Sequence, residues 1–215
     1  LAGNRESYVR VMVTRGSGPL GLDTGFEAKP LRVIIVGPLV PPSDEAYERG
    51  ISVVTFRTQR VAEATDAAGT KVGNYLVAVL AMRKARNEGG SEALIVDQQG
   101  NIVEGATSNL FAVTGGTLVT PPEAAGILPG ITRAVLLDLA RELAWPVELR
   151  PLPVDEALRA DELFVCSSIR ELLPVVRVDG RPIASGEVGP TSRKLLRAFR
   201  EKVRRIQGLR RAPSG

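Results

Sequence analysis

The sequence contains no histidine among its 215 residues. This absence excludes Ser-His-Asp and Cys-His catalysis, and it removes the commonest protein ligand of zinc. Any acid–base chemistry must therefore use lysine, glutamate, aspartate or tyrosine side chains. We accordingly expect no metal site.

Cysteine and long apolar runs are also scarce. The single cysteine, Cys166, cannot form an internal disulfide, and its neighbours Phe164 and Val165 predict a buried, structural thiol in a strand. No apolar run reaches the roughly 20 residues that a membrane-spanning helix needs, and nothing near Leu1 resembles a signal peptide. We therefore expect a globular protein of the reducing cytoplasm that does not bind membranes.

The net charge of +4 comes from one end of the chain. The segment from Arg193 to Arg211 carries many basic residues against a single acid, Glu201. Its apolar residues recur at helical spacing, which predicts an amphipathic C-terminal helix with a solvated basic face. Nucleic-acid binding is disfavoured, because no aromatic residues alternate with the basic ones to stack on bases.

The remaining chain alternates short β-branched segments with two helical patterns. One helix is expected from a Thr70 cap to about Glu88, and another from Ile131 to Leu143. Short strands separated by Gly-containing turns predict an α+β fold with antiparallel pairing. The expected strands are 8–14, 31–36, 51–58, 93–96, 102–103, 109–113, 117–120, 163–167 and 175–178.

A glycine-rich segment between the first two strands matches the dinucleotide-binding pattern G-x-G-x-x-G. It runs from Gly16 to Gly21 and contains Pro19. The pattern binds a dinucleotide only where it opens a helix, and the residues that follow here are typical of a turn. We therefore interpret the segment as a connection and not as a nucleotide site.

The middle of the chain resembles the signature of the class IV aminotransferases. The matching segments are Glu104 to Phe111 (EGATSNLF), Leu118 to Thr120 (LVT) and Leu128 to Arg133 (LPGITR). Upstream, Lys71-Val-Gly-Asn resembles the cofactor lysine of this family with its asparagine. Downstream, residues 164–174 (FVCSSIRELLP) resemble the strand that brings hydroxyls to the cofactor phosphate.

This resemblance implies a fold-type IV enzyme that uses pyridoxal 5'-phosphate (PLP). It also implies that residues 1–40 would be the remainder of a small N-terminal domain, and the Pro-rich break that ends at Asp44 predicts a linker at 41–44. Residues 45–208 would form the PLP-binding domain, followed by a basic tail at 209–215. The family normally has a further stretch before the first strand, with an arginine that grips the phosphate, and that stretch is absent from this sequence.

Each residue in the resemblance has a chemical task that its type can perform. Lys71 would carry PLP as a Schiff base, since a neutral amine can attack an aldehyde and move a proton. Glu104 would hold the proton on the pyridine nitrogen. Backbone amides at a helix N-terminus bind phosphate, which assigns that role to Gly130, Ile131 and Thr132.

Further residues are assigned to the cofactor site by the same resemblance. Ser168 and Ser167 would donate hydroxyls to the phosphate, and Tyr75 would reach the phenolic oxygen. The remaining cofactor-site residues are Thr107, Ser108, Asn109 and Leu128. Arg15 resembles an arginine that some relatives direct at the substrate carboxylate.

Structural roles remain open for several of these residues. Lys71 and Arg15 could be surface residues, and Glu104 could belong to a turn. Tyr75 could lie in the core, and the hydroxyls of Thr107 and Ser108 could satisfy backbone groups.

The resemblance implies an aminotransferase that moves an amino group between an amino acid and a 2-oxo acid, working as a homodimer. The alternatives are an aminodeoxychorismate lyase, which gives 4-aminobenzoate and pyruvate, and a non-catalytic paralogue. Branched-chain enzymes usually have a glutamate before the signature asparagine, where this chain has Ser108. That departure leaves the substrate and its enantiomer open.

Overall fold

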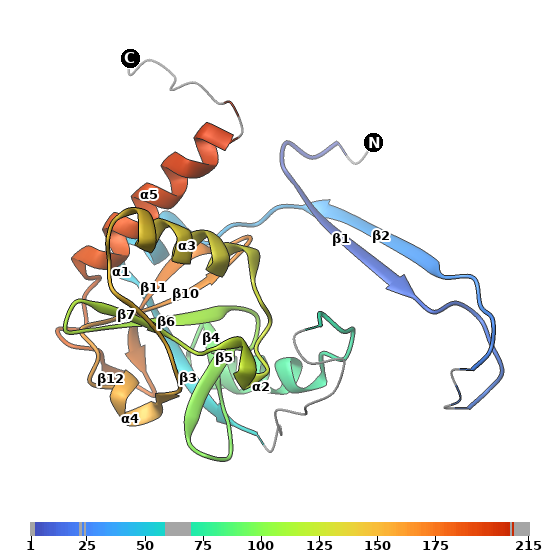
Figure 1. Ribbon diagram of the computed structural model, residues 1–215, viewed down its shortest axis with the longest axis horizontal. Coiled ribbons are helices and arrows are strands. Elements are labelled where there is room, and N and C mark those ends of the chain that lie inside the picture. Colours follow the sequence, from blue (N-terminus) through green and yellow to red (C-terminus); the bar gives the residue numbers. More distant parts are fainter. Residues whose placement is uncertain (1–2, 22, 24, 59–69, 207, 209–215) are drawn as a thin grey trace. The chain divides into compact units, whose positions relative to one another are not determined.

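The computed structural model describes residues 3–21, 23, 25–58, 70–206 and 208. These residues divide into two compact units, Leu1–Pro41 and Pro42–Gly215 (Figure 1). The predicted basic tail at 209–215 lies outside the described residues. None of the helices in the described part of the chain could cross a lipid bilayer.

The first unit is an antiparallel pair of strands, β1 (Ser7–Thr14) and β2 (Leu31–Pro38). The glycine-rich segment 16–21 lies in the connection between these strands, and the described residues that follow it, 23 and 25–30, form no helix, as the turn residues predict. Arg15 lies in the same connection, where its Nη2 atom donates to the carbonyl of Phe26 at 3.1 Å and its guanidinium stacks on the Phe26 ring.

The second unit is built on one curved sheet that orders its strands β8-β7-β6-β10-β11-β3-β4-β5-β9, with β12 paired to β11. The strands are β3 (Ile51–Arg57), β4 (Glu92–Val96), β5 (Asn101–Gly105), β6 (Asn109–Thr114), β7 (Thr117–Thr120), β8 (Val147–Leu149), β9 (Leu152–Pro153), β10 (Glu162–Ser167), β11 (Glu171–Val178) and β12 (Arg181–Pro182). An isolated antiparallel bridge between Gly105 and Ser108 closes the turn between β5 and β6.

The α+β prediction is confirmed, but the expectation of antiparallel pairing is only partly right. Parallel pairs join β11 to β3, β3 to β4 and β7 to β8. The β3–β4 pair lies around a crossover from β3 through α2 (Leu76–Asn87) to β4. A helical crossover returns the chain in its original direction, so the strands on either side of it run parallel.

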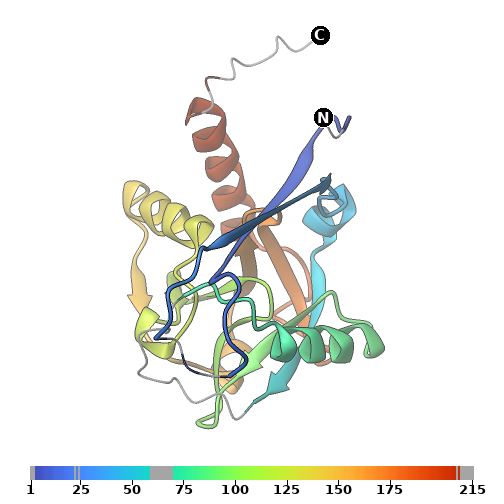
Figure 2. The same cartoon turned by 90° about the vertical axis from the view of Figure 1, so that its right-hand side faces the viewer.

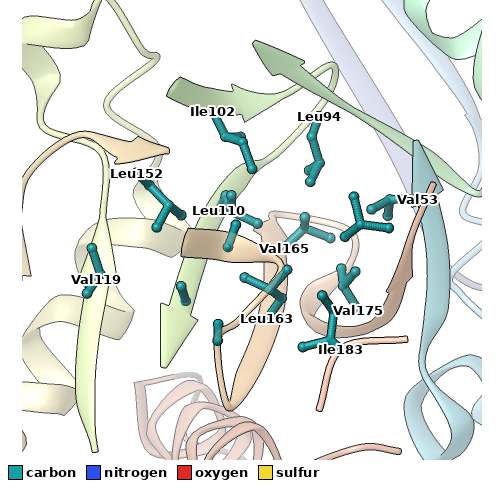
Figure 3. Packing of buried hydrophobic residues seen from close by; sticks show 14 of the residues in the cluster. Val53, Leu94, Ile102, Leu110, Val119, Leu152, Leu163, Val165, Val175 and Ile183 are labelled. Carbon is teal, nitrogen blue, oxygen red and sulfur yellow. The ribbon is translucent and has the colours of Figure 1, made fainter. Parts of the chain in front are cut away.

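Alternation along the strands divides the apolar side chains between two faces of the sheet. On β10, Leu163 and Val165 point to the inner face and Phe164 and Cys166 to the outer face. Figure 3 shows the inner set, in which Leu94, Leu110 and Val165 from different strands point toward one another.

Helices cover the outer face in two places (Figures 1 and 2). Helix α3 (Ile131–Glu142) and helix α5 (Pro190–Ile206) pack on each other and on β10. Helix α2 packs on β3 and β4. The short helices α1 (Asp44–Arg49) and α4 (Val154–Ala157) and a 3₁₀ turn, η1 (Glu123–Ala125), complete the unit.

The second helix begins later than the sequence predicts. Helix α2 starts at Leu76 with Tyr75 as its N-cap, and not at the expected Thr70 cap. Gly73 and Asn74 lie in the intervening segment, and both have low helix propensity. Lys71 is therefore an exposed residue on an irregular segment before the helix, and not part of its first turn.

Candidate active site

The site is built around the backbone of Leu128, which lies between η1 and α3. Its N–H donates to Oε2 of Glu104 at 3.1 Å, and its carbonyl accepts from Nδ2 of Asn109 at 2.9 Å. Glu104 lies near the end of β5, and Asn109 begins β6. Signature residues from two strands and a loop therefore meet at one residue.

Gly130 lets Asn109 pack against the start of α3, because glycine has no side chain. A Cβ atom at this position would overlap the Oδ1 atom of Asn109. Gly130 has a φ of −70°, which any residue can adopt, so its requirement is one of space and not of backbone conformation. The glycine brings the start of α3 against β6.

The first turn of α3 offers backbone N–H groups to an anion. Gly130 is the N-cap and supplies no side-chain cap, and the first turn holds no acidic residue. The first helical N–H groups have no partner within a helix, and the dipole favours negative charge there. Ile131 is exposed and Thr132 is buried. The start of α3 thus has the backbone arrangement that an anion site needs.

The buried Arg133 fixes the chain that leads to this helix. Its Nη2 atom donates to the carbonyl of Pro121 at 2.9 Å, and its Nε atom donates to Oγ1 of Thr120 at 3.3 Å. Its Nη1 atom lies 3.6 Å from the Glu123 carboxylate. Burial lowers the pKa of the guanidinium, and the Glu123 charge opposes that shift. The closing residue of the signature is therefore a structural anchor.

The end of β10 lies beside the start of β6. Cys166 pairs with Asn109 in the sheet register, which places Ser167 next to the turn that precedes Asn109. Ser167 is half-buried and accepts a long hydrogen bond from the N–H of Arg170, while Ser168 is exposed. The sheet register therefore brings the end of β10 close to the turn between β5 and β6.

Thr107 and Ser108 donate to a residue that the sequence analysis did not identify. Both hydroxyls donate to Oε2 of Glu92, at 2.8 and 3.1 Å. Their donor hydrogens are therefore used by this carboxylate. A glutamate directly before an apolar strand segment, Ala93–Val96, was the available signal, because the alternation of a buried strand directs such a residue inward.

The roles of three further residues remain predictions. Lys71 is exposed, and among the described residues it has no hydrogen bond or ion pair. Tyr75 is 37% exposed at the N-cap of α2. Arg15 belongs to the first unit, whereas the residues around Leu128 belong to the second.

The sequence is similar to one family of known proteins, the class IV aminotransferases. A sequence model of the amino-transferase class IV family matches residues 1–178. The branched-chain-amino-acid aminotransferase of Escherichia coli (strain K12) is 38% identical over 156 residues, which are 72% of this chain and 50% of that protein. A Methanocaldococcus jannaschii protein, provisionally named as a branched-chain-amino-acid aminotransferase, is 39% identical over 92% of this chain and 67% of its own length.

Solved structures resemble the fold over most of the chain. A crystal structure of the Escherichia coli branched-chain amino acid aminotransferase matches with a TM-score of 0.83 at 34% identity, covering 91% of this chain and 65% of that one. The branched-chain amino acid aminotransferase of Thermobaculum terrenum, solved in its PLP form, matches with a TM-score of 0.79 at 28% identity, covering 92% and 64%. The chain therefore spans about half to two thirds of the length of the relatives it matches.

Proposed function

The chain belongs to the class IV aminotransferase family, and from that membership we propose that it is a PLP-dependent aminotransferase of fold type IV. It would move an amino group between an amino acid and a 2-oxo acid. The observation that carries the proposal is the backbone of Leu128, which is held by Glu104 on one side and by Asn109 on the other.

The side chains and amides at this site fit PLP. A phosphate needs several N–H or O–H donors, and the uncapped start of α3 provides amides at Ile131 and Thr132. Ser167 ends β10 and Ser168 follows it, next in sequence to the Cys166–Asn109 pair, which supports these serines as the hydroxyl donors. A pyridinium nitrogen needs a carboxylate, and Glu104 has one carboxylate oxygen fixed by the Leu128 N–H.

When bound, PLP supplies an electron sink for the carbanion that forms at the substrate Cα. The protein residues then have separate tasks. Glu104 keeps a proton on the ring nitrogen by electrostatic attraction, while its contact with Leu128 prevents the carboxylate from rotating away. The α3 amides orient the phosphate. Lys71 holds the cofactor through its amine and moves the proton at the substrate Cα.

Other predicted residues support the site in a different way. Thr107 and Ser108 use their hydroxyl hydrogens on Glu92, so we assign them to positioning the turn before Asn109. We keep Tyr75 as a contact of the phenolic oxygen and Arg15 as a contact of the substrate carboxylate. Their residue types and the family resemblance support these two roles.

Branched-chain amino acids are the substrate class that we propose first. The support is that several relatives named for this activity match the chain at 38% identity. Ser108, at the position where those enzymes usually have glutamate, is the reason to test other amino acids, including D-enantiomers, beside them. No specific contact favours the lyase alternative or the non-catalytic one.

A half-reaction screen tests the function. The full chain is loaded with PLP and mixed with single L- and D-amino acids or with aminodeoxychorismate, and the visible spectrum is followed. An aminotransferase converts the lysine-bound form to the pyridoxamine form with its amino acid. Release of 4-aminobenzoate without that conversion would instead identify a lyase, and no spectral change with any substrate would contradict catalysis.

We also propose that the protein acts as a homodimer in the cytoplasm. Exposed apolar side chains before and within α2, namely Val72, Leu76 and Val79, support an interface. The lone, buried Cys166 supports a reducing compartment. Sedimentation of the purified chain would measure the oligomeric state directly.

A further inference from the structure

A buried carboxylate lies beside the proposed site. Glu92 begins β4 and is fully buried. The same alternation that directs Leu94 and Val96 to the inner core directs Glu92 inward as well. A buried charge is unfavourable unless it is paired and hydrogen-bonded, so the partners of Glu92 must hold their places for the fold to be stable.

One carboxylate oxygen of Glu92, Oε1, accepts from the N–H of Ala93 at 3.0 Å. The side-chain partners come from two separate turns and meet at the other oxygen, Oε2. Thr107 and Ser108, in the β5–β6 turn, donate to Oε2 of Glu92 at 2.8 and 3.1 Å. Arg170, in the β10–β11 turn, donates to the same oxygen from Nη1 at 2.5 Å, and its Nη1 atom also donates to Oγ1 of Thr107 at 2.6 Å. Within this cluster of described residues, Arg170 is thus the side chain that crosses from one turn to the other.

The β10–β11 turn has an unfavourable backbone conformation, so contacts such as those of Arg170 with Glu92 and Thr107 are needed to stabilise it. It closes where Ser167 pairs with Glu171, and Glu171 has a φ of +54°, in the left-handed region that a non-glycine residue avoids. The turn is also held from outside by the Tyr47 hydroxyl, which donates to the Arg170 carbonyl at 3.2 Å, and by Arg200, which pairs with Glu171 at 2.7 Å. Both of these come from elements other than the β5–β6 turn.

We propose that Arg170 is a positioning residue for the cofactor site. Through Glu92 and Thr107 it fixes the separation between the turn that leads to Asn109 and the turn that carries Ser167 and Ser168. The inference rests on the proposed function, because those serines are its phosphate donors. The Arg170 charge is balanced by Glu92, so its task is to hold the two turns together and not to bind a substrate anion.

Hydrogen–deuterium exchange of the cofactor-free full chain tests the link itself. We expect Arg170→Gln to raise exchange of the amides at 105–109 and 167–171 by roughly tenfold, the size expected for a lost charge-assisted hydrogen bond. Arg200→Gln is the matched control, since it frees the same β10–β11 turn from its other side. It should raise exchange at 167–171 and leave 105–109 unchanged.

Two more variants keep the test decisive if Arg170→Gln does not fold. The double variant Glu92→Gln/Arg170→Gln removes both charges together and should show the same loosening of both turns. Arg170→Lys should restore protection, because both contacts come from the single atom Nη1 and an ammonium could replace it. Unchanged exchange at 105–109 in the double variant would overturn the proposal.

Titration with PLP then tests positioning apart from stability. We expect the Kd for PLP to rise by roughly tenfold in Arg170→Gln and the double variant, and to return toward the wild-type value in Arg170→Lys. Looser turns with an unchanged Kd would reduce Arg170 to a structural role and overturn the proposal. If the wild-type chain itself bound no PLP, the proposed function would fail, while the exchange measurement would still decide whether Arg170 joins the turns.

Discussion

The Oδ1 atom of Asn109 occupies the space that a Cβ atom on residue 130 would need. This packing brings the start of α3 against β6, and it holds the Asn109 amide where Nδ2 donates to the Leu128 carbonyl. The position of the α3 start and the position of the Glu104 carboxylate are therefore both set by contacts with the backbone of Leu128 or with its partner Asn109.

A methyl group at this position should disturb the site. Gly130→Ala would push the Asn109 side chain away from Leu128 and destabilise the fold by about 1–3 kcal/mol, the usual cost of overpacking. It should also weaken PLP binding. Denaturant unfolding and PLP titration measure the two effects.

Gly37→Ala is the matched control for this substitution, because Gly37 has no atoms near its missing Cβ. It should leave both quantities nearly unchanged. A Gly130→Ala protein as stable as the control would show that Asn109 can move freely, and it would remove the packing argument.

The Glu104 carboxylate should matter through its charge as well as its position. Glu104→Gln keeps an oxygen that can accept from Leu128, so the fold and PLP binding should survive. Turnover should fall on the order of 100-fold, because an amide cannot hold the ring proton. Glu104→Ala should lose the Leu128 contact too. Comparison of rate, PLP affinity and melting temperature separates the charge from the contact, and equal rates for Glu104→Gln and wild type would contradict the assigned role.

Cys166 should make the protein less stable at alkaline pH. Burial raises the pKa of its thiol to about 12, against the opposing charge of Arg133. The unfolded chain loses this proton near pH ~8.5, whereas the folded protein keeps it. The free energy of unfolding therefore falls as the pH rises from about 8.5 toward 12.

Denaturant unfolding between about pH 8 and pH 10.5 measures this effect. The Cys166→Ala protein should show a shallower decline than wild type, although its removed sulfur lowers stability at every pH. Other alkaline groups, such as Tyr47, are common to both proteins and cancel in the comparison. Parallel curves would indicate that the thiol ionises inside the fold.

The sequence predicts the regular elements well where local patterns are strong. The apolar run at 163–167 forms most of β10 in the core of the sheet, and the helix from Ile131 begins at the expected residue. The predicted start of α2 was wrong because Gly73 and Asn74 oppose helix formation more strongly than the apolar spacing favours it. The parallel strand pairs depend on how the chain crosses over, which no local pattern encodes.

The sequence motif identified the signature residues, but it did not identify Glu92 and Arg170, the pair that joins the β5–β6 and β10–β11 turns. Glu104, Asn109 and Gly130 were identified from a motif, and the structure brings them together. Glu92 and Arg170 are 78 residues apart in the chain and meet only because β4 and the β10–β11 turn converge in the folded sheet. A pairing of that kind depends on tertiary structure, so the local sequence around either residue does not predict the other as its partner.

The position of the cofactor lysine is the central claim, and chemical trapping tests it most directly. The full chain is incubated with PLP, reduced with borohydride so that the cofactor stays on the amine that carries it, digested and analysed by mass spectrometry. We predict that the modified peptide contains Lys71, that Lys71→Ala protein shows no such peptide and no visible band, and that Lys84→Ala protein behaves like wild type. Modification of a different lysine, or a persistent visible band in Lys71→Ala protein, would contradict the account.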